Sequence, residues 1–304
     1  MTSVQNYLNL YKNFLVKFLK LGKPFKVVFD CSNGTAGPIL KKLLKANELT
    51  SLRALLINDE PDGNFPAHGP DPWAPRAMNQ LQKAVLKNKA DLGAIFDADG
   101  DRVFFVDNLG RPVASDVVSR LLTWHLKPNK VVVDVRTGWL VKSGQMSGVR
   151  CQIVESRVGH YFIKQVMRKN KAELGTEFSG HYYFKDFFYL DSGIFAAIQV
   201  MNAVSRLPYR LSDFSDLLPQ YYRSGEINFK VRDPQKLLKL IEKKYKKTAT
   251  KISHLDGLKM EFQDYWFNLR PSNTEPLIRL NVEALSQKTL KNKVKEIKAL
   301  LRHN

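Results

Sequence analysis

The sequence contains little cysteine and no long apolar run. Its two cysteines, Cys31 and Cys151, lie far apart and match no metal-binding spacing, which argues against a disulfide scaffold and favours a reducing cytoplasm. No segment approaches the roughly 20 apolar residues that cross a bilayer. Near the N-terminus, Lys12, Lys17 and Lys20 interrupt the apolar stretch that a signal peptide requires. The sequence therefore predicts a cytoplasmic protein without a membrane partner.

Acidic residues are scarce relative to basic ones. The 29 Asp and Glu residues face 48 Lys and Arg residues, which gives a formal net charge of +19. Such an excess can attract nucleic acids, membrane surfaces or small anions. Neither an Arg-rich tail nor an aromatic-interleaved RNA-recognition pattern is present, so nucleic-acid binding would rest on charge alone. We prefer a solvated surface of lysines on helical faces, for example Lys236, Lys239, Lys243, Lys244, Lys246 and Lys247.

Strand and helix patterns alternate through the first two thirds of the chain. An apolar stripe at helical spacing covers residues 4–19 and is interpreted as a docking face in preference to a membrane anchor. Expected strands cover residues 25–30, 52–57 and 91–96, with helices up to about residue 45 and over 76–88 between them. A second such unit has strands at 130–135 and 151–155 and helices around 121, 137–146 and 160–169. The alternation favours parallel sheets covered by helices.

The rhythm changes after Pro208. Strands are expected near 226–231, 257–262, 265–270 and 277–283, with helices at 234–246 and at the C-terminus. This order is typical of an α+β domain. We therefore predict an α/β protein in which two consecutive α/β domains, residues 1–113 and 114–222, precede a smaller α+β domain, residues 223–304.

Three carboxylates on alternate residues follow the expected strand at 91–96. Asp97, Asp99 and Asp101 can converge on one cation only in a turn, and Gly100 permits that turn. Carboxylate oxygens suit Mg²⁺ or Ca²⁺. An EF-hand is excluded because its twelfth position would hold Asn108 instead of Glu. An acidic solvated turn is the alternative.

Two further polar segments carry candidate binding groups. In the first, Glu177, Ser179 and His181 alternate, so an extended loop would present all three to vicinal sugar hydroxyls, although a polar strand edge explains them nearly as well. The second, with Arg270, Ser272, Asn273 and Thr274, follows an expected strand and can form an anion cradle from a guanidinium, hydroxyls and backbone N–H groups. A simple proline-bounded turn is its alternative.

Arg136 and His160 lie just after an expected strand and at the start of an expected helix. Taken alone, each is better explained as an ordinary structural residue.

In this order, the three segments resemble the α-D-phosphohexomutase superfamily, particularly its bacterial phosphomannomutase/phosphoglucomutase branch. The resemblance covers nearly the whole chain and extends to residues 61–66, 157–167 and 268–284. Members of this family have four domains around a central cleft, and this chain resembles the second, third and fourth.

The resemblance assigns roles residue by residue. It implies that Asp97, Asp99 and Asp101 bind Mg²⁺, that Arg102 contacts a phosphorylated serine, and that Arg136 and His160 are basic groups that assist proton transfer. Glu177 and Ser179, with His181 nearby, would select sugar hydroxyls, and Arg270, Ser272, Asn273 and Thr274 would hold the non-reacting phosphate. The ligands would be mannose or glucose 1- and 6-phosphates and 1,6-bisphosphates. Thr176 stands where the family usually has Gly, which weakens the sugar-loop assignment slightly.

One departure from the family concerns the phosphoryl donor. The family's first domain carries its phosphoserine in a Thr-Ala-Ser-His-Asn-Pro-like stretch, and the Ser253-His254 pair here lacks the following Asn-Pro. Met1 lies so close ahead of the strand at 25–30 that we expect no room for that domain. The chain would thus be a mutase part that works with a separately encoded phosphoserine domain or survives as a gene fragment; the alternative is a non-catalytic phosphosugar-binding protein.

Overall fold

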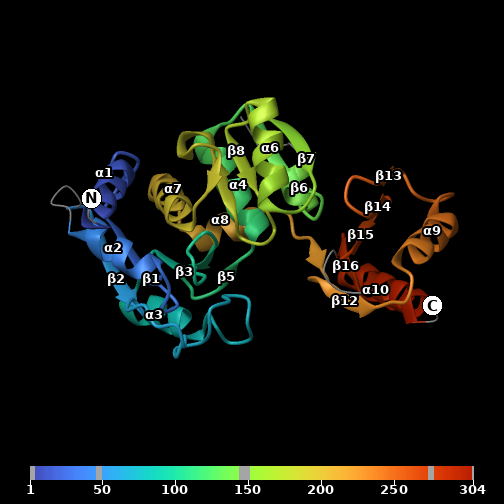
Figure 1. The fold of residues 1–304 in the computed structure, drawn as a ribbon, viewed down its shortest axis with the longest axis horizontal. Helices are drawn as coiled ribbons and strands as arrows, with labels where there is room; N and C mark the ends of the chain where they lie inside the picture. Colours follow the sequence, from blue (N-terminus) through green and yellow to red (C-terminus); the bar gives the residue numbers. More distant parts are fainter. Residues whose placement is uncertain (1–3, 46–49, 144–150, 273–276, 303–304) are drawn as a thin grey trace.

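The computed structural model describes residues 4–45, 50–143, 151–272 and 277–302. Its described strands form three sheets that follow one another along the chain, so the molecule has three successive units (Figure 1). The first two units are α/β and the third is a smaller α+β unit, as the sequence predicts.

The first unit is built on the sheet β2-β1-β3-β4-β5. Strands β1 and β3 are buried along nearly their whole length, which explains their continuous apolar sequences. The elements are α1 (Val4–Val16), β1 (Phe25–Asp30), α2 (Ala36–Leu44), β2 (Leu52–Ile57), α3 (Asn79–Asn88), β3 (Leu92–Phe96), β4 (Val103–Asp107) and β5 (Pro112–Val113).

The second unit is built on the sheet β10-β9-β8-β6-β7. Its elements are α4 (Ser115–Leu126), β6 (Lys130–Asp134), α5 (Trp139–Lys142), β7 (Gln152–Ser156), α6 (His160–Asn170), β8 (Leu174–Thr176), β9 (Tyr182–Phe184), the 3-10 helix η1 (Lys185–Phe187), β10 (Leu190–Asp191), α7 (Gly193–Arg206) and α8 (Leu211–Leu217).

Both sheets are mixed, which corrects the expectation of wholly parallel sheets. Strands β1, β2 and β3 are parallel, as are β6, β7 and β8, but β4 and β5 in the first sheet and β9 and β10 in the second run antiparallel. The reversals follow directly from the tight turns after β3 and β8, because a short turn can join only antiparallel neighbours. These two turns contain residues 97–102 and 177–181, so the irregular edge of each sheet is also where the predicted binding groups lie.

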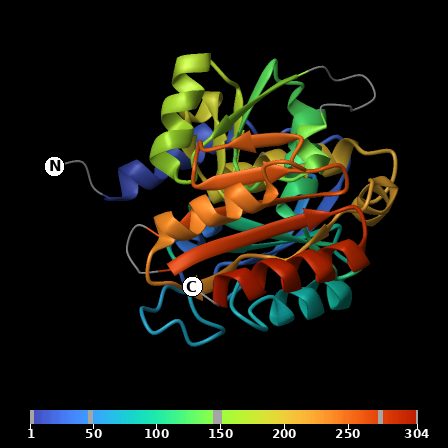
Figure 2. The same ribbon diagram turned by 90° about the vertical axis from the view of Figure 1, so that its right-hand side faces the viewer.

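The third unit is an antiparallel sheet with two helices. It consists of β11 (Tyr222–Arg223), β12 (Ile227–Lys230), α9 (Pro234–Tyr245), β13 (Lys251–Ser253), β14 (Leu258–Glu261), β15 (Tyr265–Pro271), β16 (Leu277–Ala284) and α10 (Gln287–Arg302). The order is β11-β16-β15-β14-β13, with β12 also paired to β16. In Figure 2, α9 and α10 lie beside the strands of this unit. The six lysines that the sequence places on helical faces are all exposed here.

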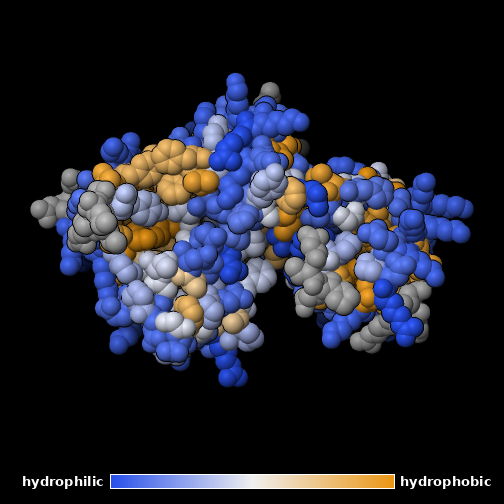
Figure 3. Space-filling view, in the orientation of Figure 1, coloured by the Kyte–Doolittle hydropathy of each residue, from blue (hydrophilic) through white to orange (hydrophobic). Residues whose placement is uncertain are grey.

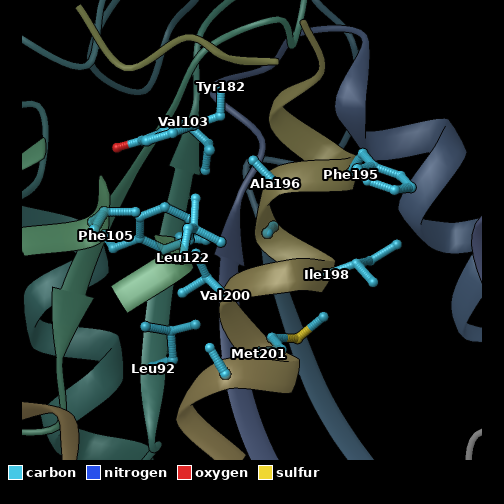
Figure 4. Packing of buried hydrophobic residues seen from close by; sticks show 14 of the residues in the cluster. Leu92, Val103, Phe105, Leu122, Tyr182, Phe195, Ala196, Ile198, Val200 and Met201 are labelled. Carbon is cyan, nitrogen blue, oxygen red and sulfur yellow. The ribbon is translucent and has the colours of Figure 1, made fainter. Parts of the chain in front are cut away.

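Helix α7 joins the cores of the first two units. Its residues from Gly193 to Ser205 are all buried, and an all-round apolar helix is expected in such a place. In Figure 4, Ala196, Val200 and Met201 of α7 pack near Leu92 and other residues of the first sheet. The same core includes residues of α4 and β9 from the second unit. The first two units therefore share one hydrophobic core.

Helix α1 docks onto this shared core. Leu15 is fully buried, and Tyr11, Phe14 and Phe18 pack against the cluster, with Phe18 in edge contact with Phe195 of α7. The expected docking face is thus present. Within the described part of the chain, no helix is long and apolar enough to cross a membrane.

The third unit has a separate core, formed by its own sheet and helices. Its contacts with the second unit are largely polar: the Trp139 N–H donates to Glu283, the Val158 N–H donates to Asp256, and the side chain of Lys259 binds Glu155. Figure 3 shows an indentation of the surface between the third unit and the rest of the molecule.

Candidate active site

The three predicted metal-ligating carboxylates come together in the turn between β3 and β4. One oxygen of each of Asp97, Asp99 and Asp101 lies within 4.8 Å of the others. Gly100 turns the chain with φ of +76°, a conformation that favours glycine. Three converging carboxylates suit a hard divalent cation such as Mg²⁺, so the residues present fit this ion.

Asp97 is the buried member of this set, whereas Asp99 is exposed and Asp101 half-buried. Its Oδ1 accepts the backbone N–H groups of Gly100 and Arg102 at 3.1 Å, and its Oδ2 accepts the Arg102 Nε–H at 2.5 Å. Burial raises the pKa of Asp97 to about 6 despite the lowering effect of Arg102. Burial thus disfavours the charged form of this carboxylate, and Arg102 with the two backbone N–H groups offsets only part of that cost.

Glu177, Ser179 and His181 also lie on one side of their turn, as their alternation predicts. The Ser179 hydroxyl lies 3.0 Å from His181 Nδ1 and 3.4 Å from a Glu177 oxygen. Glu177 is 2% exposed, and it accepts the Gly159 N–H at 2.7 Å and the Tyr183 hydroxyl at 3.0 Å. The carboxylate is thus held rigidly, while Ser179 lines a cavity described below.

The two turns are bonded to each other across the first and second units. The Val103 N–H donates to the Gly180 carbonyl at 3.1 Å, and His181 Nε2 lies 3.5 Å from Asp101 Oδ1. Gly180 has φ of +87°, and a Cβ there would lie 2.5 Å from the ring of Phe104, so only glycine fits. Although burial lowers the pKa of His181, hydrogen bonds to Asp101 and Glu177 raise it to about 9.

Arg136 follows β6 and is 6% exposed. Its Nη2 donates to Asp134 at 2.8 Å, its Nη1 lies 3.5 Å from Glu226, and the guanidinium lies over the Phe178 ring. The pKa of Arg136 is raised because Asp134, Glu177 and Glu226 outweigh the opposing effect of burial.

His160 opens α6 and stands apart from this group. Its side chain is 62% exposed, and its Nδ1 lies 3.8 Å from Asp191 Oδ2, beyond hydrogen-bonding distance. It is linked to the site through Asp191, one oxygen of which lies within 4.8 Å of ligand atoms of Asp101 and His181, and through the neighbouring Gly159 N–H, which binds Glu177.

The predicted phosphate segment begins at the end of β15. Arg270 lies 3.9 Å from Glu226, and burial lowers its pKa, as does the nearby Arg136. The backbone N–H of Ser272 donates to the Leu277 carbonyl at 2.8 Å. Asn273 and Thr274 lie outside the described residues.

A cavity of about 370 Å³ is lined by residues of all three units, and we call it the central cavity. It is lined by Asp71, Trp73, Arg102, Arg136, Phe178, Ser179, Glu226, Asn228 and Arg279. A larger hollow of about 570 Å³, with mainly apolar walls, shares Trp73 and Phe178 with it. The central cavity is the better candidate for chemistry because three of the predicted site residues, Arg102, Arg136 and Ser179, line it, whereas none lines the larger hollow.

Six of the lining residues were not predicted from the sequence as site residues: Asp71, Trp73, Phe178, Glu226, Asn228 and Arg279. Glu226 and Arg279 come from the start of β12 and from β16, and Trp73 comes from the long connection between β2 and α3. Arg279 and Glu226 are ion-paired at 3.0 Å. The spacing of Arg279, nine residues after Arg270 on the next strand, was the available signal, since antiparallel pairing places the two in register.

Models of one protein family match successive parts of the chain. They describe the phosphoglucomutase/phosphomannomutase alpha/beta/alpha domain II at residues 5–110, domain III at 113–222 and the C-terminal domain at 226–300. The chain belongs to the phosphoglucomutase/phosphomannomutase family. The three units correspond to domains II, III and the C-terminal domain of that family, in this order.

Individual relatives agree with this membership. The chain is 39% identical over 302 residues to a phosphomannomutase of Methanocaldococcus jannaschii, covering 97% of this chain and 65% of the relative. A solved structure of a phosphoglucomutase/phosphomannomutase family protein from Burkholderia thailandensis superposes with a TM-score of 0.84 at 26% identity, covering 98% of this chain and 64% of that one. The chain thus spans just under two thirds of the relatives it matches.

A more distant structure shows the same fold. It is the Aspergillus fumigatus N-acetylphosphoglucosamine mutase, solved in complex with GlcNAc-6P and magnesium, and it superposes with a TM-score of 0.72 at 15% identity, covering 98% of this chain and 65% of that one.

Proposed function

We propose that this chain is the sugar- and metal-binding part of a phosphomannomutase/phosphoglucomutase that interconverts hexose 1-phosphates and hexose 6-phosphates. The observation that carries this proposal is the direct contact between the two turns, in which His181 touches Asp101 while Ser179 lines the central cavity with Arg102 and Arg136. The turn with the carboxylates suited to a cation is thus bonded to the turn with the proposed sugar-binding hydroxyl, and that hydroxyl lines the same cavity as two arginines suited to a phosphate.

Asp97, Asp99 and Asp101 would hold Mg²⁺, which supplies charge neutralisation during phosphoryl transfer. Support comes from their convergence and from the magnesium in the distant fungal neighbour. Arg102 would contact the phosphoryl group beside these carboxylates. Glu177 and Ser179 would accept and donate hydrogen bonds to sugar hydroxyls, with His181 fixed between them.

Phosphoryl transfer would use a phosphoserine supplied by a separate domain, because no family-like serine stretch occurs among the 304 residues. The bond between phosphorus and the serine oxygen breaks as a sugar hydroxyl oxygen bonds to phosphorus and gives its proton to a base, and the leaving serine oxygen takes up a proton. The resulting 1,6-bisphosphate turns round and returns its other phosphoryl group to the serine. Arg270, Ser272, Asn273 and Thr274 would hold the phosphate that does not react, and Arg136 and His160 would assist the proton transfer.

The proposed ligands are mannose or glucose phosphates, and the proposed setting is the cytoplasm. The proposed domain limits remain residues 1–113, 114–222 and 223–304. We also propose that nucleic acids are not ligands, since the sequence has neither an Arg-rich tail nor an aromatic-interleaved RNA-recognition pattern.

The experiment is complementation in trans. The purified chain is mixed with a phosphoserine domain from a related mutase, and conversion of mannose 1-phosphate to mannose 6-phosphate is measured with Mg²⁺ and the 1,6-bisphosphate. Activity of the mixture, absent from either part alone, is expected. Activity of the chain alone would show that another residue accepts phosphate, and inactivity of a folded, associated pair would contradict the proposal.

A non-catalytic phosphosugar-binding protein is the second candidate. It is favoured by the presence of the binding turns without the donor serine stretch. Binding of hexose phosphates by the chain, together with failure of every complementation, would establish it.

A further inference from the structure

Glu226 lies at the passage from the second unit to the third, one residue before β12. Three guanidinium groups surround its carboxylate: Arg279 Nη1 is 3.0 Å from Oε1, while Arg136 Nη1 and Arg270 Nη2 are 3.5 and 3.9 Å from Oε2. The side chain is 19% exposed and lines the central cavity. One carboxylate thus faces positive charges from both sides of the cavity.

The three arginines come from separate segments, the end of β6, β15 and β16. Arg136 has a carboxylate partner of its own in Asp134, but the pKa of Arg270 is lowered, by burial and by Arg136. Like charges brought together away from water repel strongly. Without Glu226, mutual repulsion would favour turning Arg270 and Arg279 away from each other and from Arg136.

The geometry leaves donors free for an external anion. Glu226 Oε1 accepts a hydrogen bond from Arg279, whereas Oε2 has no hydrogen-bond partner among the described residues. At 3.5 and 3.9 Å, Arg136 and Arg270 are attracted to Oε2 without donating hydrogen bonds to it. Arg136 donates to Asp134 through Nε and Nη2, but among the described residues neither its Nη1 nor Arg270 Nη2 has a hydrogen-bond acceptor. These two groups can therefore donate to a phosphate, which accepts hydrogen bonds from arginine forks well.

We propose that Glu226 is a positioning residue of the phosphate subsite: it holds the guanidinium groups of Arg279, which lines the central cavity, and of Arg270 next to it, for the phosphate of a hexose phosphate. This inference rests on the function proposed above, because it takes a phosphosugar as the ligand. A competing role for Glu226 predicts the opposite change in phosphate affinity: if Glu226 occupied the place of the phosphate, removing its charge would strengthen phosphate binding.

The test is calorimetric titration of the whole 304-residue chain with mannose 6-phosphate and, in parallel, with inorganic phosphate. Glu226→Gln keeps the shape of the side chain and removes its charge, and we expect roughly tenfold weaker binding of both probes. Glu226→Asp keeps the charge and is expected to retain more affinity than Glu226→Gln. The matched control is Glu296→Gln, in α10 outside the lining of the cavity, with the affinity of the natural chain expected.

A double-mutant cycle separates positioning from a general structural effect. If Glu226 acts through Arg279, the loss in Glu226→Gln/Arg279→Gln is smaller than the product of the two single losses. Thermal unfolding of each variant verifies its fold. Unchanged or tighter binding by Glu226→Gln, or fully multiplicative losses, would overturn the inference while leaving the proposed function standing. Failure of the natural chain to bind either probe would overturn both.

Discussion

The substitution Glu155→Gln tests whether an ion pair across their boundary stabilises the packing of the third unit against the second. Glu155, in β7, is bound by Lys142 of the same unit and by Lys259 of β14, whose Nζ lies 3.1 Å from its Oε1. Both lysines also lie over the ring of Trp266, at 5.9 and 4.8 Å from its centroid. The Lys259 side chain is only 3% exposed, so this ion pair crosses a nearly dry boundary between two units that share no apolar core.

The pKa of Glu155 indicates how much its ion pairs contribute to the free energy of unfolding. Burial tends to raise this pKa, but Lys142 and Lys259 overcome the effect and lower it from 4.5 to about 2. Such a shift corresponds to about 3 kcal/mol, and partial exposure of the carboxylate reduces the expected contribution to about 2 kcal/mol. Because the folded-state pKa lies below the unfolded one, this stability is present above pH 4.5 and is lost as the pH falls toward 2.

The assay is urea unfolding of the natural chain and Glu155→Gln at several pH values. The variant should be less stable by about 2 kcal/mol at about pH 7, and the difference should narrow by about a third to a half at about pH 3.5. The exposed pair of Asp216 with Arg111 supplies the control, since Asp216→Asn should cost less than about 1 kcal/mol. A difference between natural chain and Glu155→Gln that does not change with pH would refute the reasoning.

The remaining predictions concern the metal turn and the shared core. Asp101→Asn should weaken Mg²⁺ binding by at least about tenfold in calorimetry, with Asp216→Asn unchanged; equal affinity would exclude Asp101 as a ligand. Gly193→Ala should lower the free energy of unfolding in urea by about 2 kcal/mol, because the added Cβ would lie 2.8 Å from the Gly100 carbonyl oxygen. An unchanged free energy of unfolding would show that the turn at Gly100 shifts at little cost and would contradict this prediction. Phe195→Ala should cost about 3–5 kcal/mol and expose α1 to limited proteolysis, whereas an uncleaved α1 would contradict its dependence on this ring.

Some elements of the fold could be predicted from local sequence patterns alone. Strands β1 and β2 have the expected limits, because turn residues bound their short apolar runs. Helix α7 was missed: its sequence is mostly apolar, and its few polar residues at helical spacing, Gln199, Asn202 and Ser205, are buried and mark no solvent-exposed face. The reversal of β4 was missed as well: its sequence is as apolar as that of a parallel central strand, and only the turn ahead of it decides its direction.

The candidate site divides in a similar way. Asp97, Asp99 and Asp101 are close in sequence, so a single turn brings them together and their spacing along the chain is enough to predict the cluster. Glu226 has no such neighbours, since its partners Arg136, Arg270 and Arg279 lie on three other segments. Its position depends on how the third unit sits against the second, which no local pattern contains.

The separate cores also bear on how the site is assembled. The metal and sugar turns are fixed to each other, because the first two units share a core through α7 and are bonded at Gly180. Arg270 and Arg279, by contrast, belong to the third unit, whose core is separate and whose contacts with the second unit are largely polar. Polar interfaces of this kind allow relative movement of domains more readily than apolar ones. A hexose phosphate held by both parts would add its own hydrogen bonds across the boundary between the second and third units. Ligand binding should therefore favour an arrangement in which Arg270 and Arg279 lie close to the metal and sugar turns. The size of this effect equals the difference between the ligand's binding free energy in that arrangement and in one where the third unit lies farther away.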